Sequence, residues 1–241
     1  MTEMSAVSIF DHIRELRKRI VKSVSVAVLG FVVAYVFYDA FIGWLLVPFE
    51  NAGQTELIVT SVFEGFVAKM KFCALAGFVG TLPFHVYQLL RFVFPGLSVR
   101  ERRVVLSAAI AGGVLALLSL VLSYAWLIPF TLSTMTSAEF VPDSVGVLLH
   151  FEQNIFYIIN MMLYGMLAFQ FPILLEVMLF FGWVTRRQLL SASRYVVVGI
   201  LVVAAIVTPP DVISQCGIAI PLTLLYFLSI LVAKIFGWGG E

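Results

Sequence analysis

Two glutamates surrounded by arginines are the residues best suited to bind a ligand. Glu15 lies in Arg14-Glu15-Leu16-Arg17-Lys18-Arg19, and Glu101 lies in Arg100-Glu101-Arg102-Arg103. A carboxylate accepts two parallel hydrogen bonds from one guanidinium, so two carboxylates held on one membrane face suit a ligand with paired guanidinium groups. The alternative is local charge balance, because Glu15 and Arg19 are four residues apart and exposed pairs of this kind contribute little. The residue pattern alone leaves both interpretations open.

A catalytic or metal site has little support in the sequence. There is no Gly-x-Ser-x-Gly elbow, no His-Glu-x-x-His pair and no phosphate-binding Gly-rich loop. The histidines His12, His85 and His150 fall in three different segments, so a shared site is not expected. Cys73 and Cys216 both lie in apolar runs, where cysteine is typically a small buried hydrophobic residue. We therefore predict no enzymatic activity, no cofactor and no metal site.

Two further polar residues lie within an apolar run. Gln170 and Glu176 both fall in the run 155–184. Uncompensated polarity in such a segment normally faces a partner or a wet cavity, which would give these residues a functional role. The alternative is an inter-helix hydrogen bond, and for Glu176 a position close enough to the membrane interface to reach water. Both alternatives stay open at this point.

The composition indicates that lipid is the main solvent of this chain. Hydrophobic residues make up 61% and charged residues 12% of the 241 positions, and the mean hydropathy is +1.05. Soluble domains carry roughly twice this fraction of charge. Since every backbone amide needs a partner in hydrocarbon, long apolar runs predict helices and an all-α fold. The formal net charge of +1 gives no support for nucleic acid as a partner.

Apolar runs of about 20 residues predict the membrane-spanning helices. Four runs are uninterrupted, at 21–46, 71–90, 104–130 and 155–184. Thr208-Pro209-Pro210-Asp211 divides a further stretch into 195–208 and 212–236, because the prolines remove two amide donors. The run 196–207 covers only about 18 Å as a helix, less than the hydrocarbon core. It belongs either to a re-entrant hairpin or to two short spans that thin the bilayer.

The basic residues favour six spans with both ends in the cytoplasm. All of the 15 Lys and Arg residues except Lys69 and Lys71, hence 13, then lie on the same side. This side is expected to be cytoplasmic. The opposite loops, 47–70 and 131–153, are mainly acidic and long enough to hold short helices, which would form an external cap. No internal repeat or linker indicates a second domain, so residues 1–241 are predicted to form a single integral membrane domain.

Motifs spread over the whole length resemble the TatC family, the multispanning receptor subunits of the twin-arginine translocation system. The segment from His12 to Arg19 resembles the family pattern His-Leu-x-Glu-Leu-Arg-x-Arg, and Val47-Pro48 matches a proline after the first span. The other matches follow the family spacing in the first cytoplasmic loop, the third span and the last helix pair: Pro83, Tyr87-Gln88, Phe92, Pro95-Gly96-Leu97, Glu101-Arg102-Arg103, Tyr124, Pro129, Thr208-Pro209-Pro210-Asp211-Val212, Gln215 and Ile220-Pro221.

The resemblance implies a site for the Arg-Arg pair of a signal peptide carried by an already folded protein. Glu15 and Glu101 would receive the two guanidinium groups. The supporting residues would be Arg17, Arg19, Phe92, Pro95 and Arg103. Structural or partner contacts would involve Leu16, Pro48, Phe66, Tyr124, Gln170, Pro209 and Asp211. The alternative role for Asp211 is a cap on the final helix.

The resemblance also implies the architecture and the partners. It predicts a concave, glove-like bundle of six spans with short last two helices, both termini in the cytoplasm, in the inner (cytoplasmic) membrane. Single-span TatA/TatB-type subunits, further copies of the same chain and membrane lipid would be the partners, and the proton-motive force would drive export. One departure is Phe169-Gln170-Phe171-Pro172, where many members have Phe-Glu-x-Pro, so this chain keeps hydrogen-bonding capacity at that depth but lacks the charge.

Two other function classes compete with this interpretation. A small-solute transporter or channel needs ionisable residues along a continuous path, whereas the spans hold essentially Gln170, Glu176 and His85. A membrane-embedded hydrolase needs a convergent nucleophile and base, and the sequence indicates none.

Overall fold

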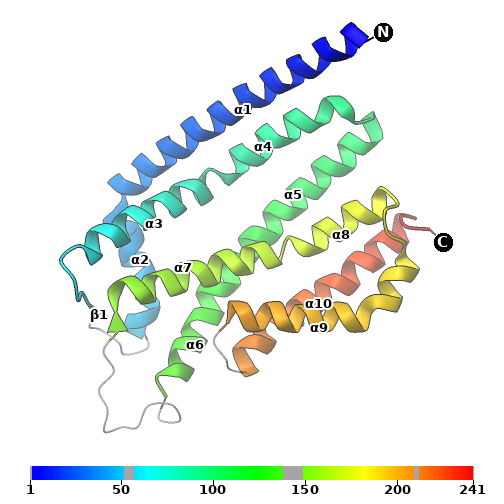
Figure 1. Ribbon diagram of the computed structural model, residues 1–241. Helices are drawn as coiled ribbons and strands as arrows, with labels where there is room; N and C mark the ends of the chain where they lie inside the picture. The colour runs from blue at the N-terminus through cyan, green and yellow to red at the C-terminus, as the bar shows by residue number, and fades with distance from the viewer. Residues whose placement is uncertain (1, 52–56, 138–148, 209–211, 241) are drawn as a thin grey trace. The chain divides into compact units, whose positions relative to one another are not determined.

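The computed structural model is almost entirely helical and describes residues 2–51, 57–137, 149–208 and 212–240 (Figure 1). The elements in chain order are α1 (Thr2–Val36), α2 (Tyr38–Asn51), β1 (Leu57–Ile58), α3 (Glu64–Gly80), α4 (Leu82–Val93), the 3-10 turn η1 (Phe94–Gly96), α5 (Val99–Leu122), the π-helical turn η2 (Ser123–Leu127), α6 (Ile128–Met135), β2 (Leu149–His150), α7 (Phe151–Ala168), α8 (Phe171–Phe180), α9 (Arg186–Val207) and α10 (Val212–Ile235).

Several of these helices are long and apolar enough to cross a membrane, as the composition predicts. In the described residues there are five such segments: His12–Val36, Val99–Met135, Phe151–Phe180, Arg186–Ile206 and Ser214–Ile235. A sixth candidate is the pair Glu64–Gly80 and Leu82–Gly96, which bends by 49°. Pro83 explains the bend, because it stands in the first turn of α4 and has no amide to continue the helix of α3. The fold is therefore that of a multi-pass helical membrane protein.

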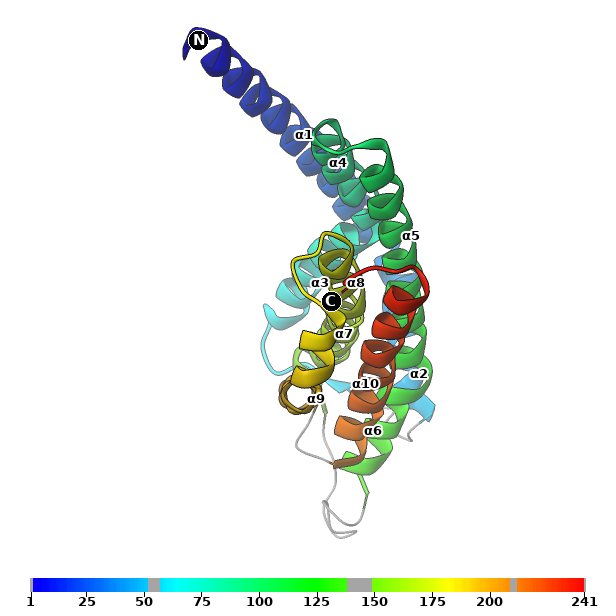
Figure 2. The same ribbon diagram turned by 90° about the vertical axis from the view of Figure 1, so that its right-hand side faces the viewer.

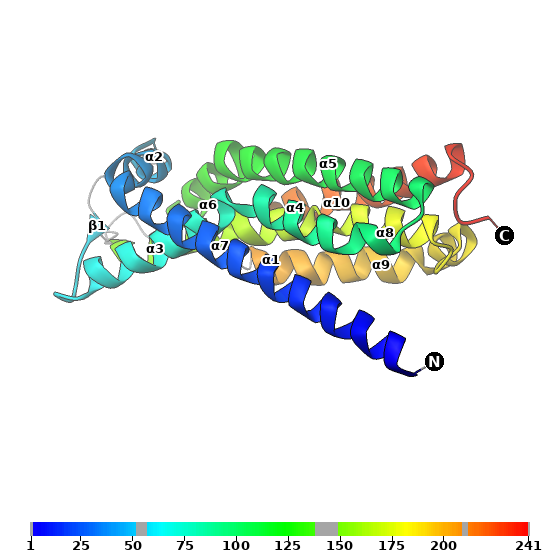
Figure 3. The same cartoon turned by 90° about the horizontal axis from the view of Figure 1, so that it is seen from above.

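Contacts divide the chain into two compact units. Unit 1 comprises Met1–Trp44 and Thr60–Leu106, and unit 2 comprises Leu45–Val59 and Ser107–Glu241. In unit 1, α1 packs against α3 and α4 (Figure 3). Gly30 and Gly77 allow the backbones of α1 and α3 to touch: a Cβ on Gly30 would lie 2.5 Å from the Gly77 carbonyl oxygen. Small residues commonly permit such close crossings in membranes, and this one fixes α1 beside α4.

In unit 2, α10 packs against α8 and α9 (Figure 2). Side-chain hydrogen bonds to backbone carbonyls connect these helices. The Tyr226 hydroxyl donates to Leu189 O at 2.7 Å, and Gln215 Nε2 donates to Leu201 O at 3.0 Å. Such bonds satisfy polar side chains that hydrocarbon does not solvate and help to hold the helices together.

None of the four uninterrupted apolar runs is a single continuous α-helix. The run 21–46 is divided between α1 and α2 at Phe37, and the run 71–90 is divided between α3 and α4 at Thr81. The run 155–184 is divided between α7 and α8 at Phe169 and Gln170, directly before Pro172. The run 104–130 contains the π-helical turn η2, in which the Ile128 amide donates to the Ser123 carbonyl. Pro129 follows this turn and donates no backbone hydrogen bond, so the helix widens locally.

The predicted short fifth helix is longer than its apolar run. α9 has 22 residues and α10 has 24. The prediction that the last two helices are short is therefore wrong. The reason is a capping box at Thr185: the Gln188 amide donates to Thr185 Oγ1 at 3.2 Å, and the Thr185 amide donates to Gln188 Oε1 at 2.9 Å. This box starts α9 before the apolar residues begin.

The loops 47–70 and 131–153 contain an unpredicted contact. β1 and β2 form a short parallel pair, in which Leu57 lies opposite Leu149 and Ile58 opposite His150. α2 and α6 extend into the starts of these loops. The predicted roles of Pro209 and Asp211, including a cap on α10, concern positions outside the described residues.

Candidate functional site

Glu15 lies in a row of side chains between α1 and α4, here called the polar seam. The seam consists of His12, Glu15 and Arg19 on α1 and of Gln88 and Phe92 on α4. Residues 12, 15 and 19 have helical spacing and share one face of α1, and residues 88 and 92 share one face of α4 in the same way. The seam therefore results from two matched helix faces that the crossing of α1 and α3 holds together.

Arg19 is the central residue of the polar seam. Its Nε donates to Glu15 Oε1 at 3.1 Å, a second guanidinium nitrogen forms an ion pair with the same oxygen, and a third contact reaches Gln88 Oε1 at 3.3 Å. The Arg19 side chain is 18% exposed and that of Glu15 is 39% exposed. The His12 ring stacks on Phe92 with centroids 4.3 Å apart. Glu15 is thus accessible but already shares its charge with Arg19.

Glu101 is held by the start of its own helix. Its Oε2 accepts a hydrogen bond from the Ser98 amide at 2.7 Å, and its amide donates to Ser98 Oγ at 3.4 Å, which completes a capping box. No basic side chain in the described part of the chain forms an ion pair with Glu101. Its carboxylate therefore keeps its negative charge available for a ligand.

The turn before Glu101 is fixed by Arg102. One of its guanidinium nitrogens donates to the Phe94 carbonyl at 3.0 Å, and the group lies 5.4 Å from the Phe94 ring centroid. The N-terminal half of α1, the end of α4 and the start of α5 lie at the same end of unit 1 (Figure 1). Unit 1 therefore gathers both predicted carboxylates at one end, from segments far apart in the sequence.

The other predicted site residues differ in their positions and exposure. Phe92 and Arg19 lie in the polar seam, whereas Arg17, Pro95 and Arg103 are exposed. Sequence reasoning did not select Gln88 or His12 for the site. Helical spacing could have identified them, because His12 precedes Glu15 by three residues and Gln88 precedes Phe92 by four.

Both carboxyl groups precede the apolar runs 21–46 and 104–130. The hydrogen bond from Arg19 lowers the pKa of Glu15 below its ordinary value. The hydrogen bond from the Ser98 amide, with a smaller contribution from the Ser98 side chain, lowers the pKa of Glu101. Both groups are therefore ionised at neutral pH, which is the state that binds a guanidinium.

In unit 2, Gln170 makes the inter-helix hydrogen bond that was one of its two predicted alternatives. Its Nε2 donates to the Gly112 carbonyl of α5 at 3.1 Å, and a Cβ on Gly112 would lie 2.8 Å from Gln170 Oε1. Glu176 is half-buried in α8. Among the remaining predicted contact residues, Leu16 and Phe66 are exposed, Pro48 is fully buried and Tyr124 is half-buried within η2.

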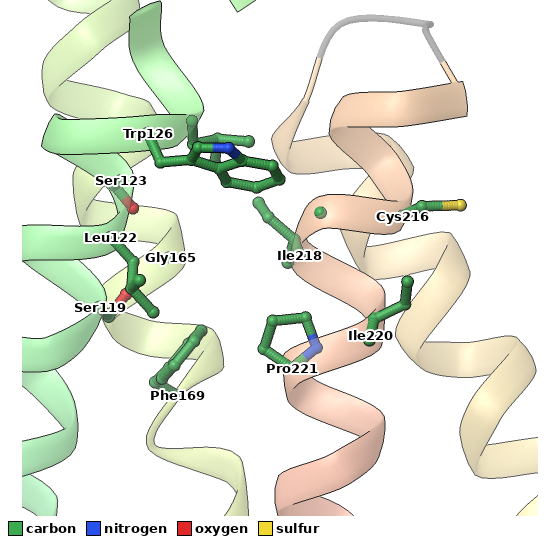
Figure 4. A pocket seen from close by; sticks show the side chains of 12 residues that line it. Ser119, Leu122, Ser123, Trp126, Gly165, Phe169, Cys216, Ile218, Ile220 and Pro221 are labelled. Atoms are coloured by element: carbon green, nitrogen blue, oxygen red, sulfur yellow. The ribbon is translucent and has the colours of Figure 1, made fainter. Parts of the chain in front are cut away.

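Unit 2 also contains a cavity of about 280 Å³ between η2, α7 and α10 (Figure 4). Its lining is almost entirely apolar and includes the ring of Trp126. Gly217 is needed there, because a Cβ would lie 2.7 Å from that ring. The buried hydroxyl of Ser119 lines the cavity and has no hydrogen-bond partner among the residues that the structure describes. Such a lining suits an apolar helix or an acyl chain better than a polar solute.

Comparisons with known proteins agree with this architecture. The sequence model of the family "Sec-independent protein translocase protein (TatC)" matches residues 11–221. A Sec-independent protein translocase protein TatC from Synechocystis is 34% identical, covering 96% of this chain and 89% of the relative. One from Helicobacter pylori strain 26695 is 32% identical, covering 92% and 86%.

Solved structures give the same result. The crystal structure of the twin-arginine translocase receptor TatC in DDM is 30% identical, covers 92% of this chain and 98% of that chain, and has a TM-score of 0.77. A second crystal structure of the receptor is 28% identical, covers 93% and 98%, and has a TM-score of 0.73. The chain therefore belongs to the TatC family of Sec-independent protein translocase components.

Proposed function

We propose that this chain is the receptor for twin-arginine signal peptides and part of the translocase that exports their folded cargo. The observation that carries the proposal is the pair of accessible carboxylates, Glu15 and Glu101, at one end of unit 1. A similar protein of known structure is described as a twin-arginine translocase receptor. Two fixed carboxylates provide a physical reason for two arginines, since guanidinium binds carboxylate bidentately and lysine does not.

The surrounding residues would position the peptide. Arg19 and Phe92 keep the polar seam closed beneath Glu15, and the exposed Pro95 and Arg103 would contact the residues that flank the arginine pair. The exposed Arg17 would serve the same purpose from α1, by donating to peptide carbonyl groups.

The wider arrangement follows from the distribution of charge. We propose that all six predicted spans cross the inner (cytoplasmic) membrane, with both termini and both carboxylates in the cytoplasm, where signal peptides arrive. The spans would form a concave, glove-like bundle that associates with further copies of the chain. Export of the cargo would draw on the proton-motive force.

Single-span subunits of the Tat system would pack beside this chain. The cavity between η2, α7 and α10 is apolar, and Ser123, which precedes Tyr124 in η2, lines it, so it suits an apolar helix. Leu122 lines it, so a direct test replaces Cys73 and Cys216 by alanine and introduces one cysteine as Leu122→Cys and another along the partner helix. Disulfide formation with position 122 at every third or fourth partner position supports this packing, and its absence in active complexes rejects it.

The receptor function itself is tested by photo-crosslinking a twin-arginine signal peptide to membranes that contain this chain. We expect crosslinks to α1 and to the α4–α5 turn that disappear when Arg-Arg is replaced by Lys-Lys. A matched control is Glu50→Gln, which removes an exposed acid of α2 and should leave crosslinking unchanged. Equal labelling by both peptides would reject the proposal.

A further inference from the structure

The ends of α8 and α10 share a short motif. α8 is followed by Phe181-Gly182-Trp183 and α10 by Phe236-Gly237-Trp238, and both glycines have φ +71°. The Trp183 amide donates to Met178 O at 3.0 Å and the Trp238 amide to Ala233 O at 2.8 Å, so each motif closes its helix as a Schellman cap. The end of α8, the start of α9 and the end of α10 lie together in unit 2 (Figure 1).

The chain beyond α10 fixes the start of α9 and engages Arg186. The Gly239 carbonyl accepts hydrogen bonds from the Arg186 amide at 3.1 Å and from its Nε at 3.2 Å. Gly239 has φ +61°, and a Cβ there would lie 2.6 Å from Leu179 Cδ2, so only glycine fits. Of the three arginines in this region, Arg186 is therefore already bound within the protein.

The other two arginines lie on one exposed face of α9. Arg187 and Arg194 are seven residues apart, which places them on the same face about two turns, or about 10.5 Å, from each other. The Arg194 guanidinium donates to the Tyr195 hydroxyl at 2.9 Å and lies 4.7 Å from its ring centroid. Both side chains are exposed, and the sequence contains no acidic residue between Glu176 and Asp211.

Apolar side chains continue this face along the helix. Leu190 is 53% and Val198 is 59% exposed, and Trp183 is 72% exposed just before the helix begins. We call Trp183, Arg187, Leu190, Arg194 and Val198 the α9 strip. Tryptophan and arginine beside exposed aliphatic residues are typical of the boundary between lipid headgroups and hydrocarbon.

We propose that the α9 strip binds an anionic phospholipid, with the phosphodiester between Arg187 and Arg194 and an acyl chain over Leu190 and Val198. Guanidinium groups bind phosphate bidentately, and two of them on a helix that carries no acidic residue favour an anionic headgroup over a zwitterionic one. The hydrogen bond to the Tyr195 hydroxyl orders the Arg194 guanidinium, and Trp183 would lie at the level of the headgroup. This site is separate from the carboxylates of unit 1 and does not depend on the signal peptide.

The test uses Trp183 as a local probe of lipid composition. Trp44, Trp126 and Trp238 are the other tryptophans, and phenylalanine at those positions leaves Trp183 alone. The full chain is reconstituted in equimolar phosphatidylglycerol and phosphatidylcholine, with one lipid or the other brominated near its headgroup. We expect brominated phosphatidylglycerol to quench Trp183 about two- to fivefold more efficiently than brominated phosphatidylcholine. Equal quenching by the two lipids would overturn the proposal.

Charge-matched variants separate this site from general attraction to an anionic membrane. Arg187→Gln with Arg194→Gln should bring the quenching ratio close to one, while Arg187→Lys with Arg194→Lys should retain only part of the preference. Arg14→Gln with Lys18→Gln removes the same charge from exposed positions of α1 and should leave the ratio unchanged. A preference that survives in the double Arg→Gln variant, or that falls equally in the α1 control, rejects the site. Circular dichroism of each variant confirms that it is folded.

Discussion

Glu15 and Glu101 present the same functional group in two different ways. Glu15 belongs to a tertiary cluster: Arg19 binds it from the same helix and connects it to Gln88 on α4. Glu101 depends only on its own turn, where Ser98 orients it. A guanidinium that reaches Glu15 must share the carboxylate with Arg19, whereas at Glu101 it meets an uncompensated charge. We therefore expect Glu101 to contribute more to affinity and Glu15 more to the geometry of binding.

The largest effect should come from Glu101→Gln. Glutamine at this position still accepts the hydrogen bond from the Ser98 amide, so the capping box stays intact while the charge is lost. We expect the affinity for a twin-arginine peptide to fall about tenfold or more, as for a lost charge-assisted hydrogen bond. Isothermal titration with the purified protein measures this, and unchanged affinity would remove Glu101 from the site.

The second effect concerns the helix crossing on which Glu15 depends. Gly77→Ala places a methyl group against the backbone of α1, which should lower the free energy of unfolding by about 1–3 kcal/mol. Gly113→Ala, whose Cβ meets nothing within 4 Å, is the matched control and should not destabilise the protein. Thermal unfolding in detergent distinguishes the two.

The crossing variant also sharpens the comparison between the carboxylates. In a Gly77→Ala background that remains folded, Glu15→Gln should cost less affinity than in the original chain, because α1 no longer holds Glu15 against α4. Glu101→Gln should cost the same in both backgrounds, since its contacts are local. Equal behaviour of the two carboxylates would contradict the distinction between tertiary and local positioning.

A smaller effect is expected for Glu15→Gln alone. Because Arg19 already neutralises part of this charge, we predict an affinity loss of about threefold. The loss should be larger for a peptide anchored by two arginines than for one with a single arginine. Competition binding with the two peptides measures the difference, and a loss greater than that of Glu101→Gln would reverse the proposed order.

The smallest effect should be that of pH. The pKa of each carboxyl is lowered by its hydrogen bonds, so both stay ionised from neutral pH down through the ordinary range of glutamate. Binding should therefore be constant between about pH 8 and about pH 5 and decline only below the lowered pKa values, as the carboxylates become protonated. A decline of binding already between about pH 8 and about pH 5 would contradict this account.

The sequence predicted the membrane class and both carboxylates because these depend on local features. Apolar runs give helices wherever water is excluded, and the charges around Glu15 and Glu101 are visible in short segments. The capping box at Thr185 and Gln188 was also readable, but an apolar-run criterion starts α9 too late. Local patterns therefore predict which helices form better than they predict the residues at which each helix begins and ends.

The tertiary contacts could not be predicted from the sequence. Nothing local indicates that Arg19 reaches Gln88, since the two residues are 69 positions apart. The parallel pairing of Leu57 with Leu149 is equally non-local. Gln170 shows the intermediate case: its polarity predicted a partner, and only the fold identifies that partner as the Gly112 carbonyl.

The central claim is that two carboxylates recognise two arginines, and a double-mutant cycle tests it most directly. Affinities are measured for the chain and for its Glu101→Gln variant with signal peptides in which each arginine in turn is replaced by glutamine. We predict that one of these peptide changes costs much less affinity on the variant than on the original chain, which identifies the arginine that Glu101 binds. Strictly additive losses for both arginines would contradict the account.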